Sequence, residues 1–294
     1  MVTTYVTWGD REDLYMETAF SILTLLPDPD ITTICVVTER PEFFSFLKDR
    51  IEIIPISPQM LVEWAGPQNF SYRRKIKGIQ RVIETYPGED VLFIDGDTFR
   101  GKPLGAIRQH LAIGNVCMQE SSGLLHKARD RNNRTIWAQL NGKTFAGYTV
   151  DKSTIRMNSG TAGLPAKDAA VIIANVLTIC DEIYSLTGYY GTEELAICFG
   201  LALHGPVMDV GSFLGHYWGN KQPWDYMLRQ FFTTQLLRAA TLEEMVEAAA
   251  RVDFTALPVY IHKPRRHRQL ERIANRYWPL TRARHYPEKL KEWV

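Results

Sequence analysis

Residues 91–97 read Val-Leu-Phe-Ile-Asp-Gly-Asp, and this stretch decides how the rest of the chain is interpreted. Its four apolar residues predict a buried strand. Asp95 and Asp97 follow at alternate positions, where two carboxylates leaving a sheet can chelate one hard divalent cation, and Gly96 lets a ligand approach the backbone. Residues 28–30 read Asp-Pro-Asp with the same spacing, but their composition predicts a turn that ends a helix. The preceding strand therefore favours a ligand site at the second copy.

The segments around this stretch alternate between strand and helix patterns. Apolar, β-branched runs predict strands at 3–7, 31–38, 51–56 and near Thr161. Helical spacing of apolar residues predicts helices over 14–26, 72–86, 166–184, 193–202 and 242–251. This alternation predicts an α/β, Rossmann-like fold with a mostly parallel mixed sheet flanked by helices. Because ligands bind beyond the carboxyl ends of the strands in such folds, Asp95 and Asp97 stand where a ligand is expected.

The composition is that of an ordinary globular protein, with 294 residues of which 45% are hydrophobic and 23% charged. This length suffices for one large domain or two small ones with a substantial core. No stretch approaches eighteen consecutive apolar residues, and no basic segment followed by an apolar run opens the chain. We therefore expect a cytoplasmic protein without a membrane span. Scattered cysteines argue against a zinc site or disulfides, and we expect reduced core residues at Cys35, Cys117, Cys180 and Cys198.

Charge is distributed unevenly, although the net charge is only +1. Residues 262–294 contain ten basic and three acidic residues, a net charge of +7, which leaves −6 for the remainder. We therefore divide the chain into a main domain at 1–261, which carries the candidate site, and a basic, partly helical C-terminal extension at 262–294. An apolar stripe with a basic face suits peripheral contact with an anionic inner membrane surface, and docking on the acidic domain is an equal alternative. Nucleic-acid binding is disfavoured, since most of the chain is acidic.

Residues 216–224 read His-Tyr-Trp-Gly-Asn-Lys-Gln-Pro-Trp and form a second candidate site in what we expect to be a loop. The imidazole of His216 suits Mn²⁺ better than Mg²⁺. Lys221, five residues later, would neutralise charge on a phosphate leaving group. The alternative for His216 is a packed, hydrogen-bonded side chain, the commoner role of a lone histidine.

These motifs occur in the order seen in GT-A nucleotide-sugar glycosyltransferases, and residues 3–224 most resemble glycosyltransferase family 8, the family of glycogenin and of lipopolysaccharide galactosyltransferases. The resemblance rests on Asp-x-Asp after a strand, Tyr-Arg-Arg at 72–74, Met-Asn-Ser-Gly at 157–160 and the segment at 216–224. That family ends its catalytic domain with His-Phe-x-Gly-x-x-Lys-Pro-Trp. Here the lysine is Lys221, one place early, and Gln222 precedes the proline.

The resemblance implies that Asp95, Asp97 and His216 bind Mn²⁺, with Mg²⁺ as the alternative metal. It implies that Lys221 holds the diphosphate, and that Asp95 also lies near the ribose or the donor sugar. Four further residues resemble donor contacts, two near the nucleotide base and two near the donor: Thr7, Tyr15, Arg74 and Asn158. An aromatic ring suits stacking on a planar base. Core packing, a solvated basic helix face and a buried turn are the simpler roles for Tyr15, Arg74 and Asn158.

Residues 191–194 read Gly-Thr-Glu-Glu where the family carries Asp-Gln before a helix, which is the clearest departure from its pattern. Glu193 and Glu194 are the pair we nominate as catalytic, because a double displacement with retention needs a carboxylate on the β face of the sugar. A front-face route needs no such nucleophile. Thr192 also fits a helix N-cap with acidic residues in the first turn, which requires no function.

The resemblance therefore implies a metal-dependent hexosyltransferase that moves a sugar from a nucleoside-diphosphate sugar, with UDP-sugar as first choice, to a glycan or lipid-linked acceptor with retention. A non-catalytic protein that binds a nucleotide sugar or a partner is the alternative, because Lys221 and Glu193–Glu194 depart from the family. A sugar nucleotidylyltransferase is disfavoured, since residues 7–10 offer a single glycine where a Gly-rich loop is needed. The donor sugar and acceptor depend on loops such as 126–148.

Overall fold

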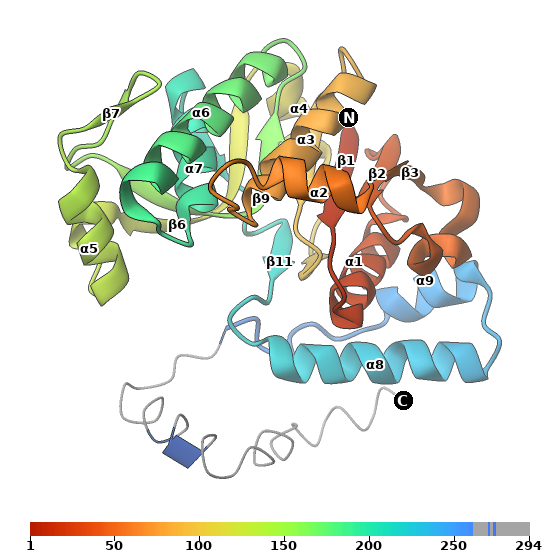
Figure 1. Cartoon of the computed structure of the whole chain (residues 1–294). Coiled ribbons are helices and arrows are strands. Elements are labelled where there is room, and N and C mark those ends of the chain that lie inside the picture. The colour runs from red at the N-terminus through yellow and green to blue at the C-terminus, as the bar shows by residue number, and fades with distance from the viewer. Residues whose placement is uncertain (261–269, 271–272, 275–294) are drawn as a thin grey trace.

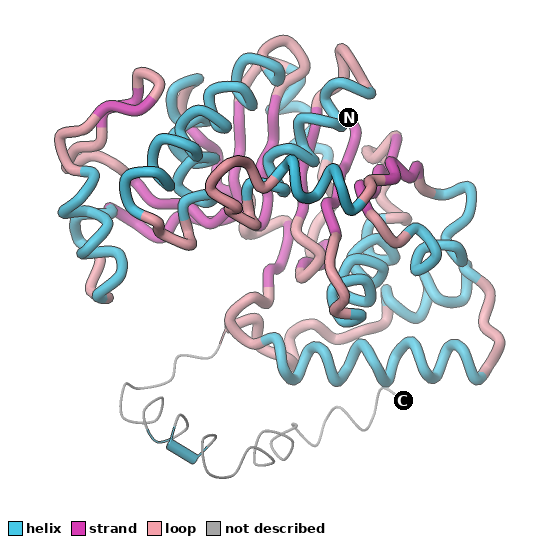
Figure 2. The backbone as a smooth tube through the Cα atoms, viewed as in Figure 1, coloured by secondary structure: helices cyan, strands magenta, loops and turns pink. Residues whose placement is uncertain are grey.

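The computed structural model describes residues 1–260, 270 and 273–274, and its strands lie in the middle of the molecule with helices on both sides (Figure 1, Figure 2). The strands are β1 (Val2–Thr7), β2 (Thr33–Thr38), β3 (Glu52–Pro55), β4 (Val91–Ile94), β5 (Thr98–Arg100), β6 (Val116–Leu124), β7 (Thr144–Phe145), β8 (Tyr148–Thr149), β9 (Ile155–Leu164), β10 (Val207–Asp209) and β11 (Leu214–His216). The α-helices are α1 (Glu12–Leu25), α2 (Pro58–Trp64), α3 (Arg73–Thr85), α4 (Gly105–Ala112), α5 (Arg131–Leu140), α6 (Ala169–Thr187), α7 (Thr192–His204), α8 (Lys221–Leu237) and α9 (Leu242–Ala250). Two 3₁₀ segments are η1 (Pro41–Arg50) and η2 (Leu125–Lys127).

A seven-stranded sheet with the order β10-β6-β9-β4-β1-β2-β3 organises the molecule. Strand β1 pairs in parallel with β2 and β4, and two further parallel pairs join β2 to β3 and β10 to β6. Strand β9 runs antiparallel to both of its neighbours, β4 and β6. The expected α/β fold with a mostly parallel mixed sheet is therefore confirmed.

Strand β4 lies at the centre of this sheet, which explains its unbroken apolar sequence. Val91 and Phe93 join the core cluster that contains buried residues of α3, α6 and α7. Leu92 and Ile94 join the opposite cluster, which contains buried residues of α1, α4 and α8. A strand covered on both faces has no solvent-facing positions, so it shows a hydrophobic run and no alternation. The strand predicted at 91–94 has these same bounds in the structure.

The predicted helices are present, with ends that differ by a few residues from the predicted ones. In α3, the buried side chains of Ile76, Ile79 and Val82 follow the spacing from which the helix was predicted. Helix α6 extends beyond the predicted 166–184 and ends at Gly188, whose φ of 58° is accessible to glycine at little cost.

Three local predictions were wrong, one of them only in part. Residues 126–148 are not a plain loop, because they contain α5, capped where the Asp130 side chain accepts a hydrogen bond from the Asn133 N–H. The loop expected over 216–224 is confined to 217–220, since His216 ends β11 and Lys221 begins α8. Thr192 is not an N-cap: Gly191 holds that position, and the Thr192 hydroxyl donates to the Tyr189 carbonyl.

Two expectations about the core and the termini can be compared with the structure. The four cysteines are free and buried, as expected, and burial raises the pKa of Cys35 to about 12. Among the described residues, α6 alone is long and apolar enough to cross a bilayer, but one of its faces is buried in the core with α7 and α3. The extension at 262–294, with its expected helix and membrane contact, lies almost entirely outside the described residues and stays a prediction.

Candidate functional site

A short two-stranded ladder outside the main sheet brings His216 to the aspartates. Strand β5 follows Asp97 directly and pairs antiparallel with β11, so that His216 lies opposite Thr98. The Tyr217 N–H also donates to the Asp97 carbonyl at 3.0 Å. On the other side, the Asp95 N–H donates to the Gly160 carbonyl of β9 at 2.7 Å. Backbone hydrogen bonds therefore fix the positions of both aspartates and of the histidine.

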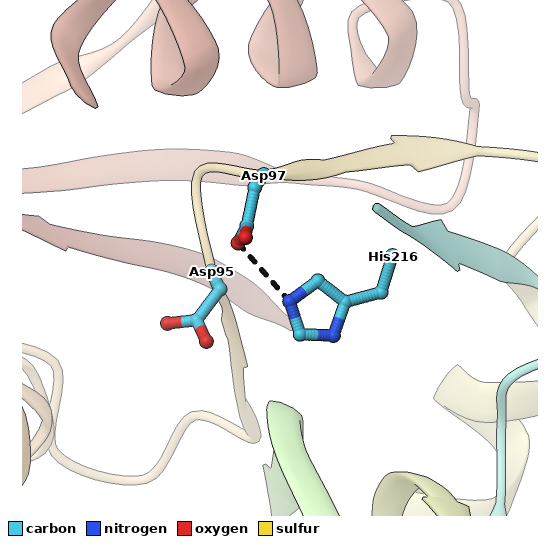
Figure 3. A group of neighbouring side chains, drawn as sticks. All are labelled: Asp95, Asp97 and His216. Carbon is cyan, nitrogen blue, oxygen red and sulfur yellow. Dashed lines mark hydrogen bonds and ion pairs between the residues drawn. The ribbon is translucent and has the colours of Figure 1, made fainter. Parts of the chain in front are cut away.

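Asp95, Asp97 and His216 form a cluster whose potential ligand atoms all lie within 4.8 Å of one another (Figure 3). Nε2 of His216 lies 3.1 Å from Asp97 Oδ1. Burial alone would raise the pKa of Asp97, but the neighbouring His216 and Lys221 outweigh it and hold that pKa well below its usual range. Two carboxylates and one imidazole are a donor set that suits Mn²⁺ or Mg²⁺. The three residues therefore fit the divalent metal that the sequence resemblance implies.

Lys221 reaches this cluster despite its position one residue earlier than in the family pattern. It is the first residue of α8, and its Nζ lies 3.1 Å from Asp97 Oδ2. The same Nζ lies 2.9 and 3.1 Å from the two carboxylate oxygens of Glu17 in α1. Burial raises the pKa of Glu17, whereas the Lys221 ammonium lowers it and so favours the ionised carboxylate. Sequence reasoning missed Glu17, although it is the single acidic residue between Leu14 and Leu26.

Lys75 occupies a comparable position on the other aspartate and was also missed. Its Nζ lies 3.0 Å from Asp95 Oδ1 and 3.1 Å from Glu193 Oε1, and its side chain is 9% exposed. Lys75 follows Arg74 in a basic stretch whose charges predict a solvated helix face. The spacing contained a signal against that assignment, because Lys75 lies four and seven residues before the buried Ile79 and Val82.

Glu193 gives the first testable prediction. Burial raises the pKa of this carboxyl from 4.5 to about 7, against the opposing effect of Lys75. Between those pH values the folded protein holds a proton that the unfolded chain has lost, so we expect Glu193 to make the free energy of unfolding fall as pH rises through this window. Urea unfolding between about pH 4.5 and 7 measures the slope. Glu193→Gln should flatten it, and an unchanged slope in that variant would contradict the assignment.

The other residues nominated from the sequence divide into two groups. Thr7, Asn158 and Glu194 line the same cavity as the Asp95–Asp97–His216 cluster. Tyr15 does not line it, because its ring is stacked on Phe43 at 4.5 Å and its hydroxyl donates to the Gly9 carbonyl.

Arg74 also lies outside the cavity lining. Its guanidinium donates to the Leu61 carbonyl at 2.8 Å and so ties α3 to α2. Trp8, directly after Thr7, lines the cavity and was not nominated from the sequence.

The cavity has a volume of about 640 Å³, in the range of small-molecule sites. Its lining contains five carboxylates, namely Glu17, Asp95, Asp97, Glu193 and Glu194. Three cationic side chains face them: Arg11, Lys75 and Lys221. Three exposed aromatic residues also contribute to the lining, at 48%, 63% and 54% exposure: Tyr72, Tyr190 and Trp218. With all five carboxylates ionised, the lining would carry an excess of two negative charges, which would repel a diphosphate unless a cation were bound as well.

The imidazole of His216 lies against Gly160, where a larger residue would leave no room for the ring. This close contact gives a second prediction. A Cβ at Gly160 would overlap Nδ1 and Cε1 of His216. We expect Gly160→Ala to displace the ring and to weaken Mn²⁺ binding about tenfold without removing a ligand, as changes around a metal site do. Titration of Mn²⁺ against the purified variant measures this effect. Gly205→Ala is the control, since a Cβ there meets nothing within 4 Å, and equal affinities of the two variants would contradict the prediction.

The fold is similar to those of solved glycosyltransferase structures. A galactosyltransferase, LgtC, solved with donor and acceptor sugar analogs, is 13% identical and has a TM-score of 0.51, with 87% of this chain and 98% of that chain covered. Mouse xyloside xylosyltransferase 1 in its apo form is 11% identical and has a TM-score of 0.47, with 71% and 84% covered. No family model and no curated protein matches the sequence. The likeness to the galactosyltransferase confirms the expected GT-A fold.

Proposed function

We propose that this chain is a metal-dependent glycosyltransferase that transfers a sugar from a nucleoside-diphosphate sugar to a glycan or lipid-linked acceptor. The observation that carries the proposal is the Asp95–Asp97–His216 cluster lining a cavity of about 640 Å³ in a GT-A fold. A divalent cation bound there, Mn²⁺ in first place, would supply the positive charge needed to neutralise a diphosphate leaving group.

The side chains of this cavity can then be given roles. Lys221 faces the cluster from the start of α8, where its ammonium group can pair with a phosphate oxygen. Trp8 and Thr7 line the cavity where β1 ends, and the indole of Trp8 offers the flat apolar surface on which a nucleotide base stacks. In this proposal Trp8 takes the role that the sequence had given to Tyr15. Asn158, in β9, offers its side chain to the donor sugar.

The aromatic residues at the rim support a sugar acceptor. Tyr72, Tyr190 and Trp218 line the cavity while they remain largely exposed. Exposed aromatic rings combine an apolar face with a polar group, which suits the apolar and hydroxyl-bearing surfaces of a sugar ring. We assign these three residues to the acceptor.

The ion pairs of the two glutamates favour the front-face route to retention. Glu193 pairs with Lys75, and Glu194 pairs with Arg156 of β9. A carboxylate held by a cation is a weaker nucleophile than a free one, so the double displacement would need one of these pairs to break. In the front-face route both glutamates keep their partners and orient groups around the donor.

Thermal unfolding of the purified protein with a panel of nucleoside diphosphates and nucleotide sugars tests the proposal. Each ligand is added with Mn²⁺, with Mg²⁺ or with a chelator, to the native chain and to Asp97→Ala. We expect one nucleotide to stabilise the native chain in the presence of metal, by about 2.7 kcal/mol at a hundredfold excess over its dissociation constant. Stabilisation that persists in the variant and in chelator would contradict the proposal.

Turnover separates the enzyme from a non-catalytic binding protein. The nucleotide sugar identified by the panel is incubated with the protein and candidate saccharide acceptors, and release of the nucleoside diphosphate is measured. The altered spacing of Lys221 was the sequence argument for a binding protein, yet its ammonium group lies 3.1 Å from Asp97. Binding without turnover of any acceptor would favour the non-catalytic alternative.

A further inference from the structure

Next to Lys221 lies a carboxylate, Glu17, to which neither the sequence resemblance nor the proposed mechanism gives a role. Glu17 projects from α1, and its side chain is 2% exposed. Both of its carboxylate oxygens contact the Lys221 ammonium, at 2.9 and 3.1 Å. Because that ammonium also lies 3.1 Å from Asp97, it is shared between two carboxylates from distant parts of the chain.

Such a buried glutamate is costly, because a carboxylate loses its hydration and must be compensated by a partner. The other buried residues of α1 are apolar, aromatic or hydroxyl-bearing. An apolar residue of similar size at position 17 would pack without that cost. A purely structural role therefore accounts poorly for Glu17, whose side chain contacts Lys221 and also forms a hydrogen bond with the Asp225 side chain of α8.

Both oxygens of Asp97 are already in use. Oδ1 lies 3.1 Å from His216 Nε2, and Oδ2 lies 3.1 Å from Lys221 Nζ. A cation entering the cluster must share Asp97 with the lysine, since both are attracted to the same carboxylate. Glu17 offers the ammonium two further oxygens on a helix that packs beside α8 (Figure 1).

We propose that Glu17 is a positioning residue that holds the Lys221 ammonium, so that Asp97 is available to a divalent cation while the lysine still faces the cavity. Without Glu17, Asp97 is the remaining carboxylate in contact with Lys221, and the ammonium competes with the metal for it. That the ammonium facing the cavity pairs with a phosphate of the donor rests on the proposed function. The competition between Lys221 and the metal for Asp97 does not depend on a nucleotide, and it can be tested without one.

Mn²⁺ titration followed by electron paramagnetic resonance tests the inference, because the signal of free Mn²⁺ falls as the ion binds. The full-length chain is compared with Glu17→Gln, Lys221→Met and the double variant, and thermal unfolding without metal checks that each is folded. Glu12→Gln is the matched control, since Glu12 is an exposed carboxylate at the start of the same helix. The double variant also avoids leaving either buried charge without its partner.

We expect Glu17→Gln to weaken Mn²⁺ binding at least about tenfold, as loss of a supporting residue does at metal sites. Lys221→Met and the double variant should bind Mn²⁺ about equally, since Glu17 acts through the lysine. Unchanged affinity in Glu17→Gln would overturn the inference. An equal loss in the Lys221→Met background would overturn it as well, because Glu17 would then act through its charge alone.

Failure of this inference is distinguishable from failure of the proposed function. If the native chain binds Mn²⁺ with the expected pattern among the variants but no nucleotide binds, the inference holds and the nucleotide-sugar proposal is contradicted. If the native chain does not bind Mn²⁺, the inference itself is overturned. If nucleotides bind with metal but the variants show no coupling between Glu17 and Lys221, the proposed function stands alone.

Discussion

Asp97→Asn is expected to lower turnover of the nucleotide-sugar donor at least about a hundredfold. Residues that only support a metal ligand contribute about 10- to 100-fold, and loss of a ligand itself should cost at least as much. The amide keeps the shape of the side chain but removes the negative charge that attracts a divalent cation. It also deprives His216 and Lys221 of the carboxylate that both contact. The measurement is release of the nucleoside diphosphate under saturating acceptor, with Mn²⁺ binding measured in parallel.

Asp10→Asn is the matched control for this experiment. Asp10 is an exposed carboxylate in the turn after β1, and it does not line the cavity. Its replacement should leave turnover and Mn²⁺ binding unchanged. Turnover of Asp97→Asn within a few-fold of the native value would show that the reaction does not depend on the metal cluster, and would contradict the mechanism proposed above.

Lys75→Met is expected to lower the free energy of unfolding by about 3–5 kcal/mol, the typical cost of removing one partner of a buried ion pair. Methionine fills a similar volume but leaves the carboxylates of Asp95 and Glu193 facing one another without the ammonium between them. Chemical denaturation at neutral pH measures the loss. The loss should be smaller near pH 5, where protonation of Glu193, whose pKa lies at about 7, removes one of the two negative charges.

Arg81→Met provides the comparison on the same helix. Arg81 pairs with Glu84 at 3.8 Å, and both side chains are about half exposed. Exposed pairs of this kind contribute about 0–1 kcal/mol, so this variant should be close to the native chain in stability. If Lys75→Met lowered the free energy of unfolding no more than Arg81→Met does, the ion pairs of Lys75 with Asp95 and Glu193 would not contribute to stability as predicted.

The sequence predicted the parts of the fold that are set by burial. Strand β4 was predictable because a central strand is apolar on both faces, and the polar residues directly after it had to lie at the edge of the sheet. Helix α3 was predictable from the spacing of its buried residues. The local pattern therefore made Asp95 and Asp97 candidates, and the segment at 216–224 and the family resemblance were needed to favour a metal site over a purely structural role.

The remaining site residues depend on contacts that local pattern does not encode. His216 reaches Asp97 through the pairing of two three-residue strands, too short to show a periodicity. The residues at 216–224 made it a candidate ligand, but its place beside the aspartates was implied only by the family resemblance. Tyr15 is covered by the η1 segment, which the sequence had not predicted, so its ring is unavailable for stacking on a base. Lys75 lies on a buried helix face, where the general preference of charges for solvent led to the wrong expectation. Glu17, also buried, drew no prediction from the sequence.

The pairing of β5 with β11 is needed to bring His216 to the aspartates, and β11 is synthesised long after β5. Asp97 and His216 are separated by 119 residues, so the third ligand joins the aspartates only after most of the chain has left the ribosome and a long loop has closed. During synthesis, the sheet from β1 to β4 can assemble while the two aspartates still lack the histidine. If the cluster binds a divalent cation as proposed, a chain that has not yet formed the β5–β11 ladder would offer the ion the two aspartates without the histidine.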